Sequence, residues 1–170
     1  MKIHTLITNT MSAAVFLAPV TMAAAEEAHH AAEHHSAAQG HHGPNIIEFF
    51  AGTTIAEHNG NTESSPSIGA SYRYAFSPKV SAGLLAEYAG GSLDYWVVGA
   101  PIVFHVGQGG WQLTAMPGAE ISSGHTEFLF RTAVGYDFEM DGYSIKPEIG
   151  ADFVDGHATI ILGVNLGFRF

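Results

Sequence analysis

Beyond Pro44, apolar and polar residues alternate along most of the chain with a period of two. The clearest run is the C-terminal "TIILGVNLGFRF", Thr159–Phe170. Every second residue in this run is large and apolar: Ile160, Leu162, Val164, Leu166, Phe168 and Phe170. Successive side chains of a strand point to opposite faces, so the run is predicted to form a strand with one wholly apolar face.

Seven further segments show the same alternation, and none of them has the period of a helix. Residues that favour turns separate the segments. The eight predicted strands are Asn45–Ala56, Ser67–Phe76, Val80–Tyr88, Tyr95–Val106, Trp111–Ile121, Glu127–Phe138, Tyr143–Phe153 and Thr159–Phe170. Tilted strands of about 9–11 residues cross a bilayer. The pattern therefore predicts an all-β fold: a closed antiparallel eight-stranded transmembrane β-barrel with short turns.

Charged residues fall on the strand face opposite the large apolar residues. A basic residue facing lipid at the bilayer midplane costs about 2–4 kcal/mol, so these side chains are predicted to point into the lumen. They are Glu48, Arg73, Glu87, Glu120, Arg131, Asp137, Lys146, Glu148, Asp152 and Arg169. The principal interpretation is a buried ion-pair network; a charge-lined pathway for cations is the alternative.

Neighbouring predicted strands suggest which of these charges meet. The expected pairs are Arg73 with Glu48, Arg131 with Glu148, and Arg169 with Glu48 across the closing seam. Each strand also has a glycine at an inward position, which leaves room for long side chains in a packed lumen.

Three prolines argue against regular strands in this barrel. Pro101, Pro117 and Pro147 fall inside predicted strands, where proline removes a hydrogen bond of the ladder. Bulges or local breaks are expected there.

The final strand also suggests which end of the barrel faces outwards. If Phe170 ends on the periplasmic side, the turns there are Ser77–Lys79, Gly107–Gly110 and Glu139–Gly142. The outer loops are then Glu57–Pro66, Ala89–Asp94, Ser122–Thr126 and Val154–Ala158, of which the first is the longest.

The first 25 residues have the pattern of a secretory signal peptide. Lys2 is followed by an apolar stretch and by Ala23–Ala25, a small-residue cleavage site. Three regions result: a signal peptide at 1–25, a flexible arm at 26–44 and the barrel at 45–170. The chain has no cysteine, so an exported protein of this sequence has no disulfide.

Composition agrees with a membrane protein and excludes one class of partner. Hydrophobic residues make up 46% of the chain and charged residues only 13%. The formal net charge is −10, with six Lys and Arg residues in total. Nucleic acid is bound through basic side chains, so a nucleic-acid partner is excluded.

The predicted arm, "EEAHHAAEHHSAAQGHHGP", is rich in histidine. Its six histidines are His29, His30, His34, His35, His41 and His42. Imidazole is a ligand for Zn²⁺, Cu²⁺ and Ni²⁺, which makes the arm a candidate site for these metals. A solvated spacer, or a segment that binds a periplasmic partner, is the other interpretation.

The final strand and terminal Phe168 and Phe170 resemble outer-membrane β-barrel proteins, in which the barrel-assembly machinery recognises this signal. The runs "YRYAFSPKVSAGLLAEYAGG" and "HTEFLFRTAVGYDFEM" look like a porin-like group of small bacterial barrels that often carry a His-rich leader. The resemblance implies export to the bacterial outer membrane, contact with its lipid and lipopolysaccharide, and a periplasmic arm. It implies no catalytic residues.

Some barrels of this size modify lipid A with a Ser and a His, so Ser122, Ser123 and His125 are candidates, with Glu127 to orient the imidazole. His125 is also a candidate partner of His58 and His157 in an external metal site, as a further alternative. An ordinary polar turn is the simpler interpretation. The leading hypothesis is a structural or binding protein without enzymatic activity; a narrow porin-like channel and a lipid-modifying enzyme are the alternatives.

Overall fold

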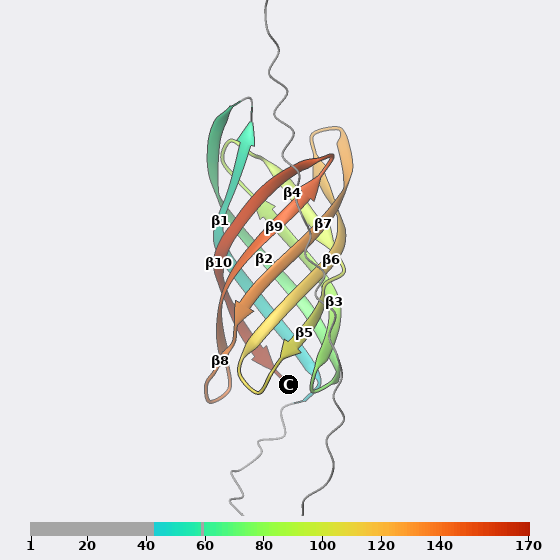
Figure 1. Ribbon diagram of the computed structural model, residues 1–170, viewed down its shortest axis with the longest axis vertical. Helices are drawn as coiled ribbons and strands as arrows, with labels where there is room; N and C mark the ends of the chain where they lie inside the picture. Colours follow the sequence, from blue (N-terminus) through green and yellow to red (C-terminus); the bar gives the residue numbers. More distant parts are fainter. Residues whose placement is uncertain (1–42, 59) are drawn as a thin grey trace, which may run out of the picture. The chain divides into compact units, whose positions relative to one another are not determined.

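Ten β-segments follow one another in the computed structural model, which describes residues 43–58 and 60–170 (Figure 1). The predicted signal peptide and the six histidines of the arm lie outside the described residues. The described part of the chain contains no helix long and apolar enough to cross a membrane. The segments are β1 (Asn45–His58), β2 (Asn61–Ser77), β3 (Val80–Ala89), β4 (Tyr95–Gly99), β5 (Ile102–Val106), β6 (Trp111–Ser122), β7 (His125–Tyr136), β8 (Phe138–Glu139), β9 (Ser144–Val154) and β10 (His157–Arg169).

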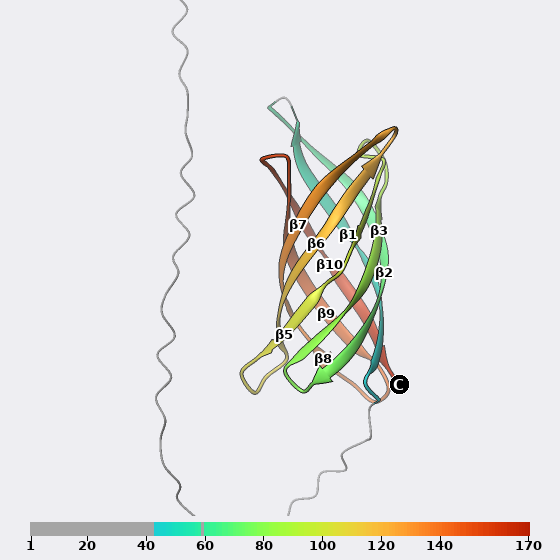
Figure 2. The same ribbon diagram turned by 90° about the vertical axis from the view of Figure 1, so that its right-hand side faces the viewer.

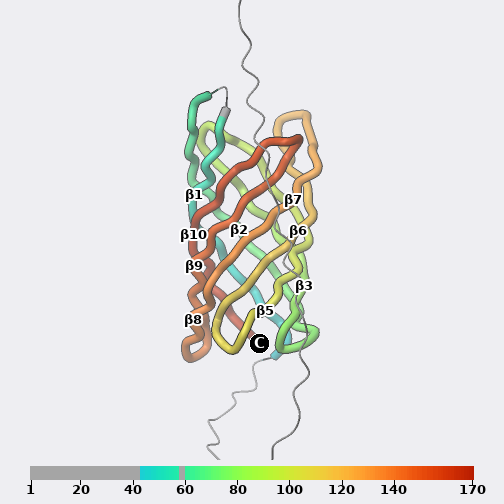
Figure 3. The backbone as a smooth tube through the Cα atoms, in the orientation of Figure 1, coloured from blue at the N-terminus to red at the C-terminus, as the bar shows by residue number. Residues whose placement is uncertain are grey.

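These segments form one closed ring of eight antiparallel strands, as predicted (Figures 1 and 3). β5 continues β4 between the same two neighbours, and β8 continues β7 beside β9. The ring closes because β10 pairs with both β9 and β1. At this seam the N–H groups of Asn45 and Phe170 each donate to the other residue's carbonyl, at 3.1 and 3.0 Å.

The barrel has two different ends, visible in Figure 2. At one end, here called the hairpin end, β1–β2, β3–β4, β6–β7 and β9–β10 are joined. The other, the terminal end, holds residues 43–45, the C-terminal Phe170 and the remaining turns. Short connections between antiparallel neighbours produce this up-and-down order.

The predicted outer loops are shorter than expected, and the first one is not a loop. β1 and β2 stay paired as far as His58↔Asn61, so the predicted loop Glu57–Pro66 is a long hairpin with two residues at its tip. An antiparallel ladder needs only backbone hydrogen bonds and therefore tolerates polar side chains. At β9–β10 the tip is Asp155–Gly156, both with positive φ, as a type I′ turn requires.

The fourth strand is interrupted at Ala100 and Pro101, between β4 and β5. The carbonyl of Pro101 accepts from the N–H of Gly83 at 3.1 Å, but proline has no N–H to donate in return. Pro117 on β6 has the same deficit, since it accepts from Ala100 at 3.0 Å and donates nothing. The register is the same on both sides, so these prolines cause a local break and no bulge.

A second interruption separates β7 from β8. Pairing with β9 stops at Gly135↔Glu148 and resumes at Phe138↔Ile145 in the same register. Pro147 lies within this gap, and the barrel closes regardless.

The distribution of polarity is the reverse of that in a soluble protein. Along β7, Phe128 and Phe130 point outwards and are exposed, whereas Leu129 and Arg131 point inwards and are buried. The same alternation holds on the other strands, and most of the large apolar side chains are exposed. Buried polar residues and an apolar exterior suit a barrel that is surrounded by lipid.

Candidate functional site in the barrel lumen

One group of charges, the Arg131 cluster, joins three strands across the lumen. Arg131 stands directly opposite Asp152 in the β7–β9 register. Its Nε and Nη2 donate to the two carboxylate oxygens of Asp152 at 2.6 and 2.8 Å, and its Nη1 donates to Glu87 Oε2 at 2.6 Å. All three side chains are buried. Because the guanidinium forms a two-pronged contact with one carboxylate and a third bond to another, its orientation is fixed.

A second group, the Glu48 cluster, consists of Glu48, Arg73, Lys146 and Glu148. Arg73 Nη2 lies 2.6 Å from Glu48 Oε1, and Arg73 Nε donates to Glu48 Oε2 at 3.2 Å. Lys146 Nζ lies 3.1 Å from Glu48 Oε1 and 3.3 Å from Glu148 Oε2. Arg73 Nη1 also donates to the hydroxyl of Ser81. Arg131 and Lys146 therefore each contact two carboxylates, and Arg73 contacts one carboxylate and one hydroxyl.

The space between the two clusters is almost filled. A cavity of about 20 Å³ lies among their side chains and Met116. This volume is close to that of one water-sized sphere. Three buried cations and their four acidic partners thus occupy the middle of the lumen.

A layer of apolar side chains lies on the hairpin side of the Arg131 cluster. On β3, β7 and β9 it is reached by moving two residues, from Glu87 to Ala89, from Arg131 to Leu129 and from Asp152 to Val154. The layer contains Ala89, Tyr95, Val97, Met116, Leu129 and Val154. Sequence reasoning missed this layer because its residues lie on the same inward face of the strands as the charged residues.

Beyond this layer the lumen opens into a cavity of about 660 Å³ at the hairpin end, here called the vestibule. The residues that line it are Ala56, Glu57, Glu63, Ser92, Leu93, Tyr95, Glu120, Ser122, Glu127, Val154, Asp155, His157 and Thr159. Its acidic side chains belong to no ion pair with Lys or Arg among the described residues. Glu120, predicted as a member of the lumen charges, lies here.

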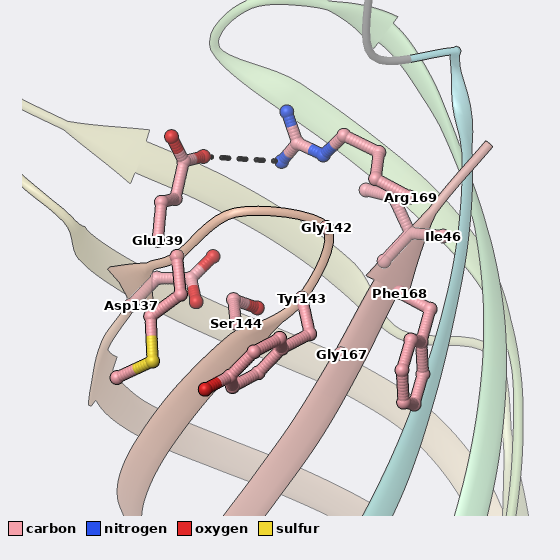
Figure 4. A pocket seen from close by; sticks show the side chains of 10 residues that line it. Ile46, Asp137, Glu139, Gly142, Tyr143, Ser144, Gly167, Phe168 and Arg169 are labelled. Atoms are coloured by element: carbon pink, nitrogen blue, oxygen red, sulfur yellow. Dashed lines mark ion pairs between the residues drawn. The ribbon is translucent and has the colours of Figure 1, made fainter.

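The terminal end has a smaller pocket of about 30 Å³ (Figure 4). Arg169 and Glu139 face each other across it, with Arg169 Nη2 3.8 Å from Glu139 Oε1. Asp137, also at this pocket, accepts a hydrogen bond from Gln112 Nε2 at 2.9 Å. Neither Arg169 nor Asp137 forms an ion pair with the two clusters.

Two of the three predicted pairs are wrong. Arg131 binds Asp152 and Glu87 rather than Glu148, which pairs with Lys146. Arg169 pairs with Glu139 rather than Glu48, because the seam register places Glu48 opposite Gly167, two residues from Arg169. The pair of Arg73 with Glu48 is present.

The candidate residues for catalysis lie at the β6–β7 turn. Ser122 pairs with His125 in the register, and His125 Nε2 lies 2.8 Å from Glu127 Oε1. His125 is largely exposed, and no hydrogen bond joins it to Ser122 or Ser123 among the residues that the structure describes.

The predicted external metal site is not assembled by the described residues. Within residues 43–58 and 60–170, no group of three or more His, Asp or Glu side chains is arranged to hold a metal ion. The side chain of His58 lies outside the description.

The C-terminal aromatic residues point outwards at the terminal end. Phe168 and Phe170 are exposed, and the ring of Phe168 packs edge-on against Phe49, with centroids 6.5 Å apart. Rings therefore line the apolar exterior at this end of the seam.

Solved structures of other β-barrels resemble this one, whereas no protein-family model and no curated protein matches the chain. Neisserial surface protein A has 12% sequence identity and a TM-score of 0.56, over 75% of this chain and 97% of that one. The N-terminal β-barrel domain of Pseudomonas aeruginosa OprF has 14% identity and a TM-score of 0.53, over 76% and 99%. Ail of Yersinia pestis, in complex with the heparin analogue sucrose octasulfate, has 16% identity and a TM-score of 0.52, over 74% and 97%. At these identities the likeness shows the barrel fold alone.

Proposed function

We propose that this chain is an integral protein of the bacterial outer membrane, with a closed lumen and a structural or binding role. The observation that carries the proposal is the reversed polarity, in which the ion pairs of the two clusters fill the lumen behind an apolar exterior. Side chains fill the interior of eight-stranded barrels. The three neighbouring structures have the same fold and support the membrane placement.

In the proposed orientation the hairpin end faces the cell exterior. Both termini of an up-and-down barrel with an even number of strands lie on one side, so Phe170 and the His-rich arm are periplasmic. Phe168 and Phe170 then serve as the signal for the barrel-assembly machinery. The apolar belt contacts lipid and lipopolysaccharide.

Cysteine labelling tests this placement directly, because the natural chain has no cysteine. Ser123→Cys lies in a turn at the hairpin end, and Asp141→Cys lies in a turn at the terminal end. A membrane-impermeant maleimide should label Ser123→Cys in intact cells and Asp141→Cys only after the outer membrane is permeabilised. Labelling of Asp141→Cys alone in intact cells would reverse the orientation, and equal labelling of both would contradict insertion.

A closed lumen distinguishes this proposal from a porin-like channel. Liposomes that contain the folded protein should not swell in sugar solutions. Swelling at a rate proportional to the amount of folded protein would favour the channel for small solutes instead.

A polyanion is not the proposed ligand, although the Ail structure was solved with one. The acidic residues at the hairpin end are Glu57, Glu63, Asp94, Glu120, Glu127 and Asp155. The described Lys and Arg residues all lie in the two clusters or at the terminal end: Arg73, Lys79, Arg131, Lys146 and Arg169. Like charges repel, so the potential at this end disfavours sulfated ligands.

For the arm, we propose binding of Zn²⁺, Cu²⁺ or Ni²⁺ by the six histidines between His29 and His42. The support is the density of imidazole in this segment of the sequence. Titration of the folded full-length protein with Zn²⁺ should show binding that is lost when all six are replaced by alanine. Binding weaker than millimolar, or unchanged by the replacement, would exclude the arm as the site.

A further inference from the structure

The vestibule has an unbalanced charge. Five of the side chains that line it are carboxylates, and none of the described residues that line it is Lys or Arg. His157 is the one histidine among the described residues that line it, and His125, outside the lining, contacts Glu127 through Nε2 at 2.8 Å. The apolar layer separates these carboxylates from the buried cations. The vestibule is therefore a region of negative potential, which attracts a cation.

Two of the carboxylates oppose each other directly. Glu120 on β6 and Glu127 on β7 are cross-strand partners in the register, and both line the vestibule. The Cβ atoms of such partners lie about 4.5–5.5 Å apart, and like charges at this separation destabilise a sheet. A positive group between the two side chains would turn this repulsion into attraction.

Tyr95, which belongs to the apolar layer and lines the vestibule, provides a second, independent observation. Tyr95 is 93% buried, since only 7% of its surface is exposed, and it lines the cavity. Its hydroxyl has no hydrogen-bond partner among the described residues. Buried polar groups are nearly always paired in native structures, so this hydroxyl is positioned for a ligand in the cavity. Because a phenol oxygen accepts as well as donates, it can receive a hydrogen bond from an ammonium group.

We propose that the vestibule binds an organic polycation, a linear aliphatic polyamine. In this arrangement one ammonium lies between Glu120 and Glu127, and a second lies nearer to Glu57 and Glu63. The methylene chain between the ammonium groups contacts Leu93 and Val154, which lie among the acidic side chains.

The size and layout of the vestibule favour such a ligand over a single metal ion. A volume of about 660 Å³ falls within the range of about 300–1,000 Å³ that is typical of small-molecule sites. Divalent ions need several oxygen ligands at short distance. The described residues present no such group of three, because their carboxylates are spread over several strands and turns.

Calorimetric titration of the folded full-length protein in a zwitterionic detergent measures this binding. It is independent of the membrane placement proposed above. The probe is spermine at low ionic strength. The test variant, Glu120→Gln with Glu127→Gln, is compared with Glu139→Gln and Asp141→Asn together, which remove the same charge at the terminal end. Heat-modifiable mobility on gels verifies that each variant is folded.

Spermine should bind the natural protein with micromolar affinity, and the vestibule variant should bind it about tenfold more weakly or worse. The terminal-end variant should stay within about twofold of the natural protein. Tyr95→Phe, which removes only the hydroxyl, should weaken binding by roughly threefold.

Three results would overturn the proposal. The first is the absence of binding, and the second is an equal loss in the vestibule and terminal-end variants, which indicates attraction to net charge alone. The third is Mg²⁺ binding as tight as that of spermine, lost in the vestibule variant, which indicates an inorganic cation site.

Discussion

The Arg131 cluster and the vestibule both contain carboxylates in the same lumen, and one apolar layer separates them. In the cluster, Asp152 and Glu87 share a buried guanidinium, and every hydrogen bond is 2.8 Å or shorter. In the vestibule, Glu120 and Glu127 face each other with no Lys or Arg of the described chain beside them, and Glu127 contacts the exposed His125. The two regions differ most in pairing. Both carboxylates of the cluster bind Arg131, whereas none of the five in the vestibule pairs with Lys or Arg among the described residues. The cluster is therefore structural, and the vestibule retains the capacity to bind a cation.

The largest expected effect comes from removing the cation of the cluster. Arg131→Met leaves Asp152 and Glu87 buried without their partner, and breaking a buried pair in this way costs about 3–5 kcal/mol. The free energy of unfolding, measured by urea titration in lipid vesicles, should fall by this amount. Glu127→Gln is the matched control and should change it little. A loss below 1 kcal/mol in Arg131→Met would mean that the cluster is hydrated like a surface pair.

A smaller loss is expected where the lumen is tightly packed without charge. Phe50 points inwards, and a Cβ atom at Gly163 would collide with its ring. Gly163→Ala should therefore lower the free energy of unfolding by about 1–3 kcal/mol, as overpacking does. Gly109→Ala is the control, because a Cβ atom there meets nothing closer than 3.7 Å. Equal stabilities of the two variants would show that the lumen is looser than described.

The smallest effect should have the opposite sign. Glu120→Gln removes one of two like charges that face each other, and should raise the free energy of unfolding by about 0.2–1 kcal/mol. The difference should shrink as salt is added, because salt screens exposed charges. The same change in the cluster, Glu87→Gln, should be destabilising. If both substitutions were destabilising, the contrast between the two regions would be lost.

The sequence was sufficient to predict the strands, their faces and the closed ring. Alternation with a period of two assigns each side chain to a face, and that assignment holds through β7, β9 and β10. It does not assign depth, which depends on the register between neighbours. The faces alone allow Arg131 to pair with Glu148, whereas the register places it opposite Asp152, four residues farther along the same strand.

The vestibule and the apolar layer were not predictable for the same reason. Glu127, Leu129 and Arg131 are successive inward residues of β7, but only the registers between strands show which residues of the other strands share a layer with each of them. The hairpin of β1 and β2, in contrast, could be predicted from the sequence. Asn59-Gly60 is a strong two-residue hairpin signal, although the polar residues on both sides of it also fit a loop.

Single-channel recording on the folded protein in a planar bilayer tests the central claim most directly, because it measures whether the lumen is closed. Arg131→Ala with Asp152→Ala, which removes two of the three side chains of the Arg131 cluster, serves as the positive comparison once its folding is verified by gel mobility. The natural protein should show no conductance steps, and the variant should show small ones. Regular steps from the natural protein, equal to those of the variant, would contradict a lumen closed by the ion-pair clusters.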